Sequence, residues 1–524
     1  MKNIKYFSLI ATFVIVSLLS LSSCAGAGSD TNDTVYLHVY NWADYIYQND
    51  PENGYTEPDM VNQFEDYINT DEHKALYGLK KNVKVVYDTF DTPETMYNEL
   101  KLNKTSYDMM CPSDYMIQKL ALNLDGLAST KIQKIDYSRL INYSKYVSPF
   151  LTDNLKAVNI SDADSTKGTL YDYACGYMWG TLGLVYNPGA NTLKEKGYTE
   201  KQIINDFSDP TAWNLLWNND DYAHIASIKD SIRDTYSMGI MHVFSDEFKK
   251  LSDDYSCGIL TKDEYKTKMN SIFNRSDKDT VAKVQSALIA LKDRIYGFEV
   301  DTGKTDIVTG KVGVNLAWSG DAVFSMDQAE EYDQHFYYAL PSLGANIWFD
   351  GWCIPESVTG DHLSAVYAFL DFLSMPKNAA ANMNYIGYTP FIAGDEVLSQ
   401  VHEWYDSDDV EGAVDYDLSY FFNGTLNDPE SDPIIHTNEE QTKRQLHAQY
   451  PEANEIDHLC IMKDFGVNND SIVAMWENVK VNPLPIWVTV VVLASIILFL
   501  AYLGSYGLIR KAKLKHRREL RNHE

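Results

Sequence analysis

Cysteine is sparse in this 524-residue sequence, and no two cysteines are spaced as a C-x-x-C pair. The six cysteines are spread along the chain, so we expect neither a zinc site built on paired cysteines nor a disulfide framework. We interpret the five cysteines that follow Cys24 as mostly buried, small apolar side chains. The sequence therefore predicts no bound metal and no cofactor.

Basic residues are also few. The sequence has 44 Lys and Arg against 74 Asp and Glu, which gives a formal net charge of −30. A surface of this charge repels nucleic acids and other anionic partners, whereas it is compatible with cationic ligands. Nucleic acid is therefore not an expected partner of this chain.

The sequence lacks the common motifs of catalytic and nucleotide-binding sites. It contains no G-x-S-x-G, no H-E-x-x-H and no G-x-x-x-x-G-K-[ST]. Nothing else in the chain indicates a nucleophile that is activated by a base. We therefore predict a binding protein and not an enzyme.

The N-terminus has the pattern of an export signal. Two lysines and an apolar run over residues 7–21 come first, and small residues follow. The run is too short for a membrane anchor, so residues 1–23 are predicted to be a signal peptide. The segment Leu21-Ser22-Ser23-Cys24 resembles the bacterial lipobox, which implies cleavage before Cys24 and lipidation of its thiol. Residues 24–34 are expected to be a linker.

The C-terminal region has a long uncharged segment. Residues 486–509 are 24 consecutive residues without a charge, enough to cross a bilayer core of about 30 Å. Seven Lys and Arg follow between Arg510 and Arg521. The positive-inside rule then places the basic tail, residues 510–524, in the cytoplasm. We expect the protein at the cell membrane, with the part before this helix on the outer, extracytoplasmic face.

Between the termini, strand and helix patterns alternate, which predicts an α/β fold. Several predicted strands end in polar or aromatic loops, where α/β folds place ligand contacts. Strands are expected at 35–40, 82–88, 107–111, 176–187, 225–228, 312–316, 337–340 and 345–354. The strand at 176–187 is long and interrupted by glycines, which suits a crossing between two lobes. Helices are expected at 59–68, from Pro93 onward with Thr92 as the cap, over much of 246–296, from about 322 and at 362–373.

The predicted strand at 345–354 carries an aromatic ring and an acid on one face. Alternation of side chains places Trp348 and Asp350 on the same side. A carboxylate beside an indole offers a charge partner and a π face to an organic ammonium ion. For an isolated W-x-D, a core Trp beside a loop Asp is the better interpretation. The ligand-binding hypothesis therefore depends on the loops that accompany this strand.

Several of these loops together match one protein family. The matching segments are Tyr40-Asn41-Trp42 with Tyr45, Glu94-Thr95-Met96-Tyr97, Tyr107-Asp108 with Pro112-Ser113 and Tyr115, Tyr177-Met178-Trp179-Gly180, Arg233-Asp234, Trp318 with Gly320, Trp348-Phe349-Asp350 with Ile354-Pro355, and Ile386-Gly387-Tyr388 with Pro390. In number, order and spacing they resemble the spermidine/putrescine-binding proteins of bacterial ABC polyamine importers, over about residues 35–480. The resemblance implies a two-lobed α/β fold of the periplasmic-binding-protein type II class, closing around a linear polyamine.

The resemblance also implies how the chain divides. The first lobe is expected to comprise residues 35–178 with 350–400, and the second lobe residues 179–349 with 401–480. The predicted transmembrane helix at the C-terminus is unusual for this family.

The resemblance further implies the residues of the binding site. Asp350 is expected to take one ammonium, Asp234 to lie at the far end of the site, and Asp321 to contact an amine as in the putrescine-specific relatives. Ser231 and Met462 depart from the spermidine binder, which has an acid and a Gln at these positions, so the choice between putrescine and spermidine stays open. The implied ligand-binding residues are Trp42, Asp44, Tyr45, Ser113, Tyr115, Asp234, Trp318, Asp321, Trp348, Asp350 and Tyr388.

The implied function is capture of putrescine or spermidine and delivery to an ABC permease that a cytoplasmic ATPase powers. We expect a monomeric receptor that a lipid on Cys24 and the helix at 486–509 tie to the membrane. Two alternatives stay open. One is a binding protein for another organic cation, a metal or a sugar, since rings and acids also line sugar sites. The other, from a different class, is a surface glycan hydrolase that uses paired carboxylates.

Overall fold

The computed structural model describes residues 33–102, 106–161, 166–407, 412–422 and 433–481, together with 491, 493–499, 501–502 and 505. The chain divides into two compact units, residues 1–473 and residues 474–524. The predicted signal peptide, Cys24 and most of the predicted membrane span 486–509 lie outside the described residues. Within the described residues, no helix has both the length and the apolar character needed to cross a membrane.

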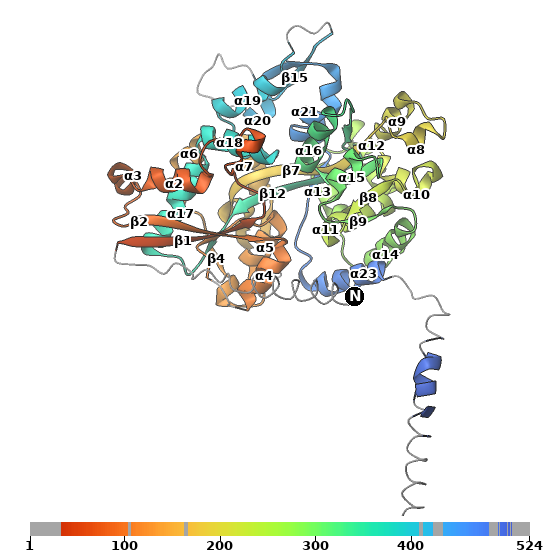
Figure 1. The fold of residues 1–524 in the computed structure, drawn as a ribbon, viewed down its shortest axis with the longest axis horizontal. Coiled ribbons are helices and arrows are strands. Elements are labelled where there is room, and N and C mark those ends of the chain that lie inside the picture. The colour runs from red at the N-terminus through yellow and green to blue at the C-terminus, as the bar shows by residue number, and fades with distance from the viewer. Residues whose placement is uncertain are drawn as a thin grey trace, which may run out of the picture. The chain divides into compact units, whose positions relative to one another are not determined.

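The strands of the first unit form two main sheets (Figure 1). The strands are β1 (Thr34–Trp42), β2 (Asn82–Phe90), β3 (Met109–Met110), β4 (Ile132–Gln133), β5 (Asn159–Ser161), β6 (Thr166–Thr169), β7 (Cys175–Tyr186), β8 (Ala226–Lys229), β9 (Gly297–Glu299), β10 (Val314–Trp318), β11 (Tyr337–Ala339), β12 (Ala345–Trp352), β13 (Ile354–Pro355), β14 (Thr389–Pro390), β15 (Val414–Asp417), β16 (Ile434–Thr437) and β17 (Leu459–Ile461). One sheet is parallel, with the order β2-β1-β3, and the larger has the order β17-β12-β7-β10-β8-β9. Strands β11 and β14 also pair with β7.

Helices pack against both sheets. They are α2 (Met60–Ile68), α3 (Asp71–Leu76), α4 (Pro93–Lys101), α5 (Asp114–Leu122), α6 (Ile141–Tyr146), α7 (Pro149–Ala157), α8 (Asn191–Lys194), α9 (Glu200–Phe207), α10 (Leu215–Asn218), α11 (Ile232–Val243), α12 (Ser245–Ser256), α13 (Lys262–Phe273), α14 (Lys278–Lys292), α15 (Gly303–Val308), α16 (Ser319–Glu330), α17 (Gly360–Leu373), α18 (Pro376–Ile386), α19 (Asp395–Tyr405), α20 (Ser419–Phe422), α21 (Gln445–Gln449), α22 (Ala453–Ile456) and α23 (Asn469–Lys480). Helices α2 and α17 contact the small sheet, and α11, α15 and α16 contact β8 and β10.

We call the small sheet with α2, α4, α5 and α17 the first lobe, and β8, β9 and β10 with α11, α15 and α16 the second lobe. In Figure 1 the first lobe lies on the left and the second on the right. The residue boundaries predicted for the lobes stay a prediction. After residue 400 the chain contacts both sides, because α20 packs on α7 whereas α21 packs on α16.

Strand β7 connects the lobes, as its length and glycines predicted. Its first half pairs with β12 and β14, and its second half pairs with β10 and β11. All of its residues are buried. Side chains lie directly against its glycines: a Cβ on Gly180 would meet the Trp348 ring, and one on Gly183 would meet the Tyr338 ring. Glycine is therefore needed here for close approach of neighbouring rings.

Helix starts follow the predicted capping pattern. The Thr92 side chain accepts a hydrogen bond from the backbone N–H of Thr95, and Pro93 opens α4. In the same way, the Ser231 side chain accepts one from the N–H of Asp234 at the start of α11. These caps fix where the first-turn acids of both helices lie.

The predicted strands and helices are present, but one strand is broken and one helix begins earlier than predicted. The strand at 345–354 is broken into β12 and β13, with a register shift between Asp350 and Gly351. The helix expected from about 322 begins at Ser319, so Asp321 lies in its first turn instead of in a loop. Of the five cysteines after Cys24, four are buried as predicted, and Cys257 is exposed.

Replacing Gly176 in β7 by Ala should lower stability by about 1–3 kcal/mol, because the new Cβ would overlap the ring of the buried Phe391. We expect a lower denaturant midpoint for the full chain in urea titrations. Gly297 in β9 is the matched control, since a Cβ there meets nothing within 4 Å. Gly297→Ala should change stability by less than about 0.5 kcal/mol. Equal midpoints for the two variants would contradict the packing described for β7.

Candidate ligand-binding site

The loop after β1 brings a tyrosine onto the acid of β12. The Tyr45 hydroxyl donates a hydrogen bond to Oδ2 of Asp350 at 2.8 Å. Between β1 and Tyr45, Asp44 adopts a left-handed conformation with φ of 51°, which turns the chain sharply. Ser113, the residue before α5, forms an isolated antiparallel bridge with Asp350. Two segments of the first lobe therefore converge on one carboxylate.

The Asp350 carboxyl is buried and only partly satisfied. Asp350 is 5% exposed, and its Oδ1 has no hydrogen-bond partner among the described residues. The pKa of Asp350 is raised to about 6, chiefly by burial and also by the charge of Asp234, although hydrogen bonds from Ser113 and Tyr45 act in the opposite direction. The pKa of the neighbouring Asp114 is raised well above its usual range by burial and by Asp350. A cation placed at Oδ1 would relieve this buried charge.

Three aromatic rings adjoin Asp350. Tyr388 contacts Tyr45 and Trp348 edge to face, with centroids 5.5 Å apart in both pairs. Trp348 is 8% exposed, and its Nε1 has no acceptor among the described residues. Rings at this spacing form a continuous π surface beside a carboxylate, which is the surface that a quaternary or primary ammonium prefers.

The Tyr388 hydroxyl links these rings to a second acid. It donates to Oδ1 of Asp321 at 3.0 Å, and Lys229 Nζ lies 3.0 Å from Oδ2 of the same carboxylate. Lys229 also pairs with Oε1 of Glu299 at 3.2 Å. Asp321 lies at the start of α16 and Lys229 at the end of β8, so both come from the second lobe.

Asp234, the third predicted acid, is buried at the start of α11. Burial raises the pKa of Asp234, although hydrogen bonds from Ser231 and Trp318 and the charge of Lys229 act in the opposite direction. The Trp318 ring in turn lies 4.6 Å from Lys229 Nζ. The charge of Asp234 also raises the pKa of Asp350, and both carboxylates are buried.

Arg233 joins the two lobes directly. Its guanidinium carbon lies 3.6 Å from the centroid of the Tyr115 ring, on α5 of the first lobe. Its Nε lies 3.7 Å from Glu94, on α4, and its NH2 group lies 3.4 Å from Asp464. The Tyr115 hydroxyl also donates to Glu94, at 3.2 Å. These contacts hold α11 against α4 and α5.

Most of the predicted ligand residues are thus brought together. We define the acid–ring cluster as Tyr45, Ser113, Asp234, Trp318, Asp321, Trp348, Asp350 and Tyr388. Tyr115 adjoins it through Arg233. Trp42 lies against Phe90, with centroids 5.0 Å apart, and its Nε1 has no partner among the described residues. Asp44 is exposed. The ligand-binding role of each of these residues stays a prediction.

Three charged residues that meet the predicted site were not predicted to do so. Lys229 was not singled out, and Glu94 and Arg233 were noted only as parts of motifs. One available signal was the lysine that closes the apolar strand β8 directly before Asp230. A lysine at the end of a buried strand requires an acidic partner, but the sequence does not show which of many acids supplies it.

The arrangement suits an organic cation. Within the described part of the chain, no group of three or more His, Cys, Asp and Glu side chains is placed to hold a metal ion. A separate cavity, lined by Cys175, Met178, Trp352 and Leu370 among others, contains none of the cluster residues. The cluster itself offers ring faces, a carboxylate oxygen without a partner and a second buried acid.

Comparisons with known proteins agree on the family. Residues 54–405 match the family model for bacterial extracellular solute-binding proteins. The putrescine-binding periplasmic protein SpuD of Pseudomonas aeruginosa is 24% identical over 368 residues, which are 68% of this chain and 79% of SpuD. The spermidine/putrescine-binding periplasmic protein of Escherichia coli is 23% identical over 377 residues, which are 72% of this chain and 82% of that protein.

Solved structures show the same fold. The substrate-binding protein PotD of a spermidine/putrescine ABC transporter from Streptococcus pneumoniae has a TM-score of 0.50 and 21% identity, and the match covers 85% of this chain and 99% of PotD. The predicted two-lobed α/β fold is therefore confirmed. Proteins of this family bind a solute instead of transforming it, in agreement with the prediction that the chain is not an enzyme. With its family model matched over residues 54–405, this chain belongs to the bacterial extracellular solute-binding proteins.

Proposed function

We propose that this chain is an extracytoplasmic receptor that captures a linear polyamine, putrescine or spermidine, in the acid–ring cluster and delivers it to an ABC permease driven by a cytoplasmic ATPase. The observation that carries the proposal is the buried Asp350 carboxylate, whose Oδ1 has no partner among the described residues. The relatives described above are putrescine- and spermidine-binding proteins, which supports the same ligand class.

A polyamine fits the chemistry of this cluster. Its ammonium groups would pair with Asp350 and other acids, and its methylene chain would lie on the rings of Trp348, Tyr388 and Tyr45. Each cation–π contact contributes about 0.5–2 kcal/mol, whereas an unpaired buried charge costs several. A neutral sugar would leave the Asp350 carboxylate without a counter-ion, so a cation is favoured over a sugar.

Capture and delivery would depend on closure of the two lobes. The acid–ring cluster draws Tyr45 and Ser113 from the first lobe and Asp321 and Asp234 from the second. A ligand held by both sets stabilises the state in which the lobes are in contact, because it binds that state more tightly than an open one. The permease would then bind the closed receptor.

Attachment to the membrane is part of the same proposal. The lipobox-like segment before Cys24 supports a lipid anchor, and the uncharged run 486–509 with its basic tail supports a transmembrane helix with a cytoplasmic end. Both would keep the receptor beside its permease and raise its effective concentration there.

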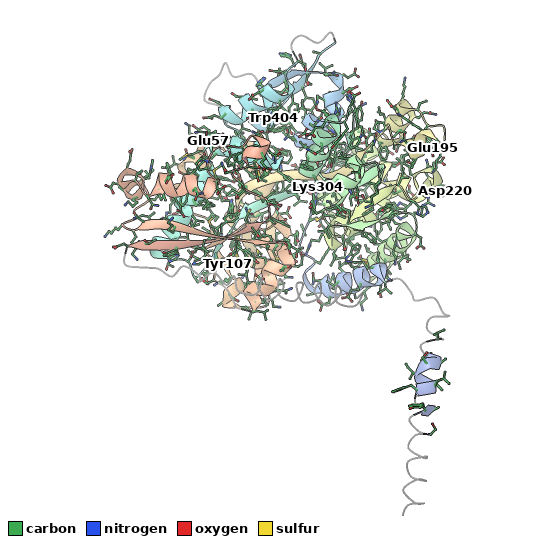
Figure 2. All side chains as sticks on the ribbon, viewed as in Figure 1. Glu57, Tyr107, Glu195, Asp220, Lys304 and Trp404 are labelled. Atoms are coloured by element: carbon green, nitrogen blue, oxygen red, sulfur yellow. The ribbon has the colours of Figure 1, made fainter. Side chains whose placement is uncertain are left out.

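Asp350→Asn should weaken putrescine and spermidine binding by at least about tenfold, because the variant keeps the shape of the side chain and removes the charge that pairs with the ammonium. Isothermal titration calorimetry on the full chain gives the affinity. Asp220→Asn is the control, since it removes the same charge at an exposed position on the outer edge of the second lobe (Figure 2). Unchanged affinity in Asp350→Asn would overturn the assignment of Asp350.

Polyamine affinity should fall as the pH falls through about 6. The raised pKa of Asp350 means that acid protonates the carboxylate before it can pair with the ligand, whose amines stay charged. We expect binding about tenfold weaker at pH 5 than at pH 7.5. Tyr45→Phe removes a hydrogen bond that lowers this pKa, so it should move the midpoint to higher pH. A calorimetric pH series tests both, and a flat profile in the native chain would contradict the buried acid.

Membrane attachment should be lost only when both ends of the chain are altered. We expect the native chain, Cys24→Ser and a chain that lacks residues 486–524 to sediment with membranes, and the combined variant to appear in the soluble fraction. Immunoblots of fractionated cells measure this. Release of the native chain in soluble form would contradict both anchors.

A further inference from the structure

One cationic position beside the acid–ring cluster is filled by the chain itself. Lys229 is 1% exposed, and its Nζ lies 3.0 Å from Asp321 Oδ2, 3.2 Å from Glu299 Oε1 and 3.3 Å from the carbonyl oxygen of Val300. The same Nζ lies 4.6 Å from the centroid of the Trp318 ring. A carboxylate and the face of an indole are the partners that a ligand ammonium would meet, and here the ammonium is tethered to β8.

The two acids around Lys229 already have partners within the chain. Asp321 accepts from Lys229 at Oδ2 and from the Tyr388 hydroxyl at Oδ1. Glu299 accepts from the backbone N–H of Gly303 at 2.9 Å and from Asn315 Nδ2 at 3.2 Å. Burial disfavours the charge on Lys229, but Asp321 and Glu299 more than offset it and raise the pKa of the lysine, so Nζ stays protonated.

The acids that lack a cation lie elsewhere in the cluster. Oδ1 of Asp350 has no hydrogen-bond partner among the described residues. Asp234 forms no ion pair with a Lys, Arg or His side chain in the described part of the chain, whereas Asp321 does. Asp350 and Asp234 are both buried, at 5% and 7% exposure. The cluster thus offers a ligand two buried acids that have no ion pair among the described residues, whereas Asp321 is paired with Lys229.

We propose, on the basis of the polyamine site proposed above, that Lys229 is a specificity-determining residue that occupies one ammonium position and limits the ligand to two ammonium groups. One would pair with Asp350 and the other with Asp234. The receptor then selects a short diamine over a triamine, because a third ammonium of the ligand would meet Lys229 and find Asp321 already paired.

The experiment compares the affinities of the full chain for putrescine, a diamine, and spermidine, a triamine, by isothermal titration calorimetry. In the native chain we expect the diamine to bind at least as tightly as the triamine. The double variant Lys229→Ala/Glu299→Gln removes the tethered ammonium and one acid, so the total charge is kept and Asp321 is freed. We expect it to raise the affinity for the triamine relative to the diamine by at least about tenfold.

A second double variant is the matched control. Lys311→Ala/Asp306→Asn also removes one lysine and one acid, which form an ion pair of 3.0 Å elsewhere in the second lobe. It should leave the ratio of the two affinities unchanged. Adding Asp321→Asn to the Lys229→Ala/Glu299→Gln variant should abolish the gain for the triamine, because the acid that takes the third ammonium is then lost.

The possible results separate this inference from the proposed function. If the native chain binds neither amine, the polyamine site itself is overturned, and the inference with it. If it binds both but prefers the triamine by more than about tenfold, only the inference on Lys229 is overturned. If the ratio of triamine to diamine affinity in the Lys229→Ala/Glu299→Gln variant stays within about threefold of the native ratio, the inference on Lys229 is also overturned. The native-chain measurement decides the question even if that variant does not fold.

Discussion

A buried carboxylate that lacks a full set of partners governs the centre of this molecule. Asp350 has one oxygen bonded to Tyr45 and the other without a partner among the described residues, and the charge of Asp234 contributes to its raised pKa. A buried charge of this kind is costly, and a cation from outside is one way to compensate it. The rings beside Asp350 add a surface that favours organic cations over other counter-ions. The need for compensation therefore defines what the site binds.

The scaffold places these acids by simple means. Strand β12 presents Trp348 and Asp350, and β7 runs beside it from one lobe to the other. Glycines in β7 allow the Trp348 and Tyr338 rings to lie directly on the strand. The first turn of α11, which Ser231 caps, adds Asp234 after β8, and the first turn of α16 adds Asp321 after β10. The chemistry of the site thus rests on strand ends and first helical turns, as in other α/β folds.

Much of this arrangement is readable from the sequence. Strand and helix periodicity indicated the α/β class, and the long glycine-containing strand indicated the crossing. Motif resemblance placed Tyr45, Asp350, Trp348 and Tyr388 in one site, and the structure brings them into contact. Their partners were harder to predict, because a pairing such as Lys229 with Asp321 joins residues that are 92 positions apart. In a chain with 74 acids, sequence alone does not indicate which acid a buried lysine contacts.

The stacking of Arg233 on Tyr115 has a consequence for the resting receptor. This contact joins the lobes through side chains of the chain itself, so it contributes part of the free energy that favours the shut form. Every 1.4 kcal/mol supplied in this way makes the apparent affinity for cargo about tenfold higher, as long as the shut form is the minor state of the empty receptor. The same contribution raises the shut fraction of the empty receptor. The difference in shut fraction between empty and loaded receptors, which a downstream partner could recognise, therefore becomes smaller. A higher apparent affinity for cargo therefore comes with poorer discrimination between empty and loaded receptors.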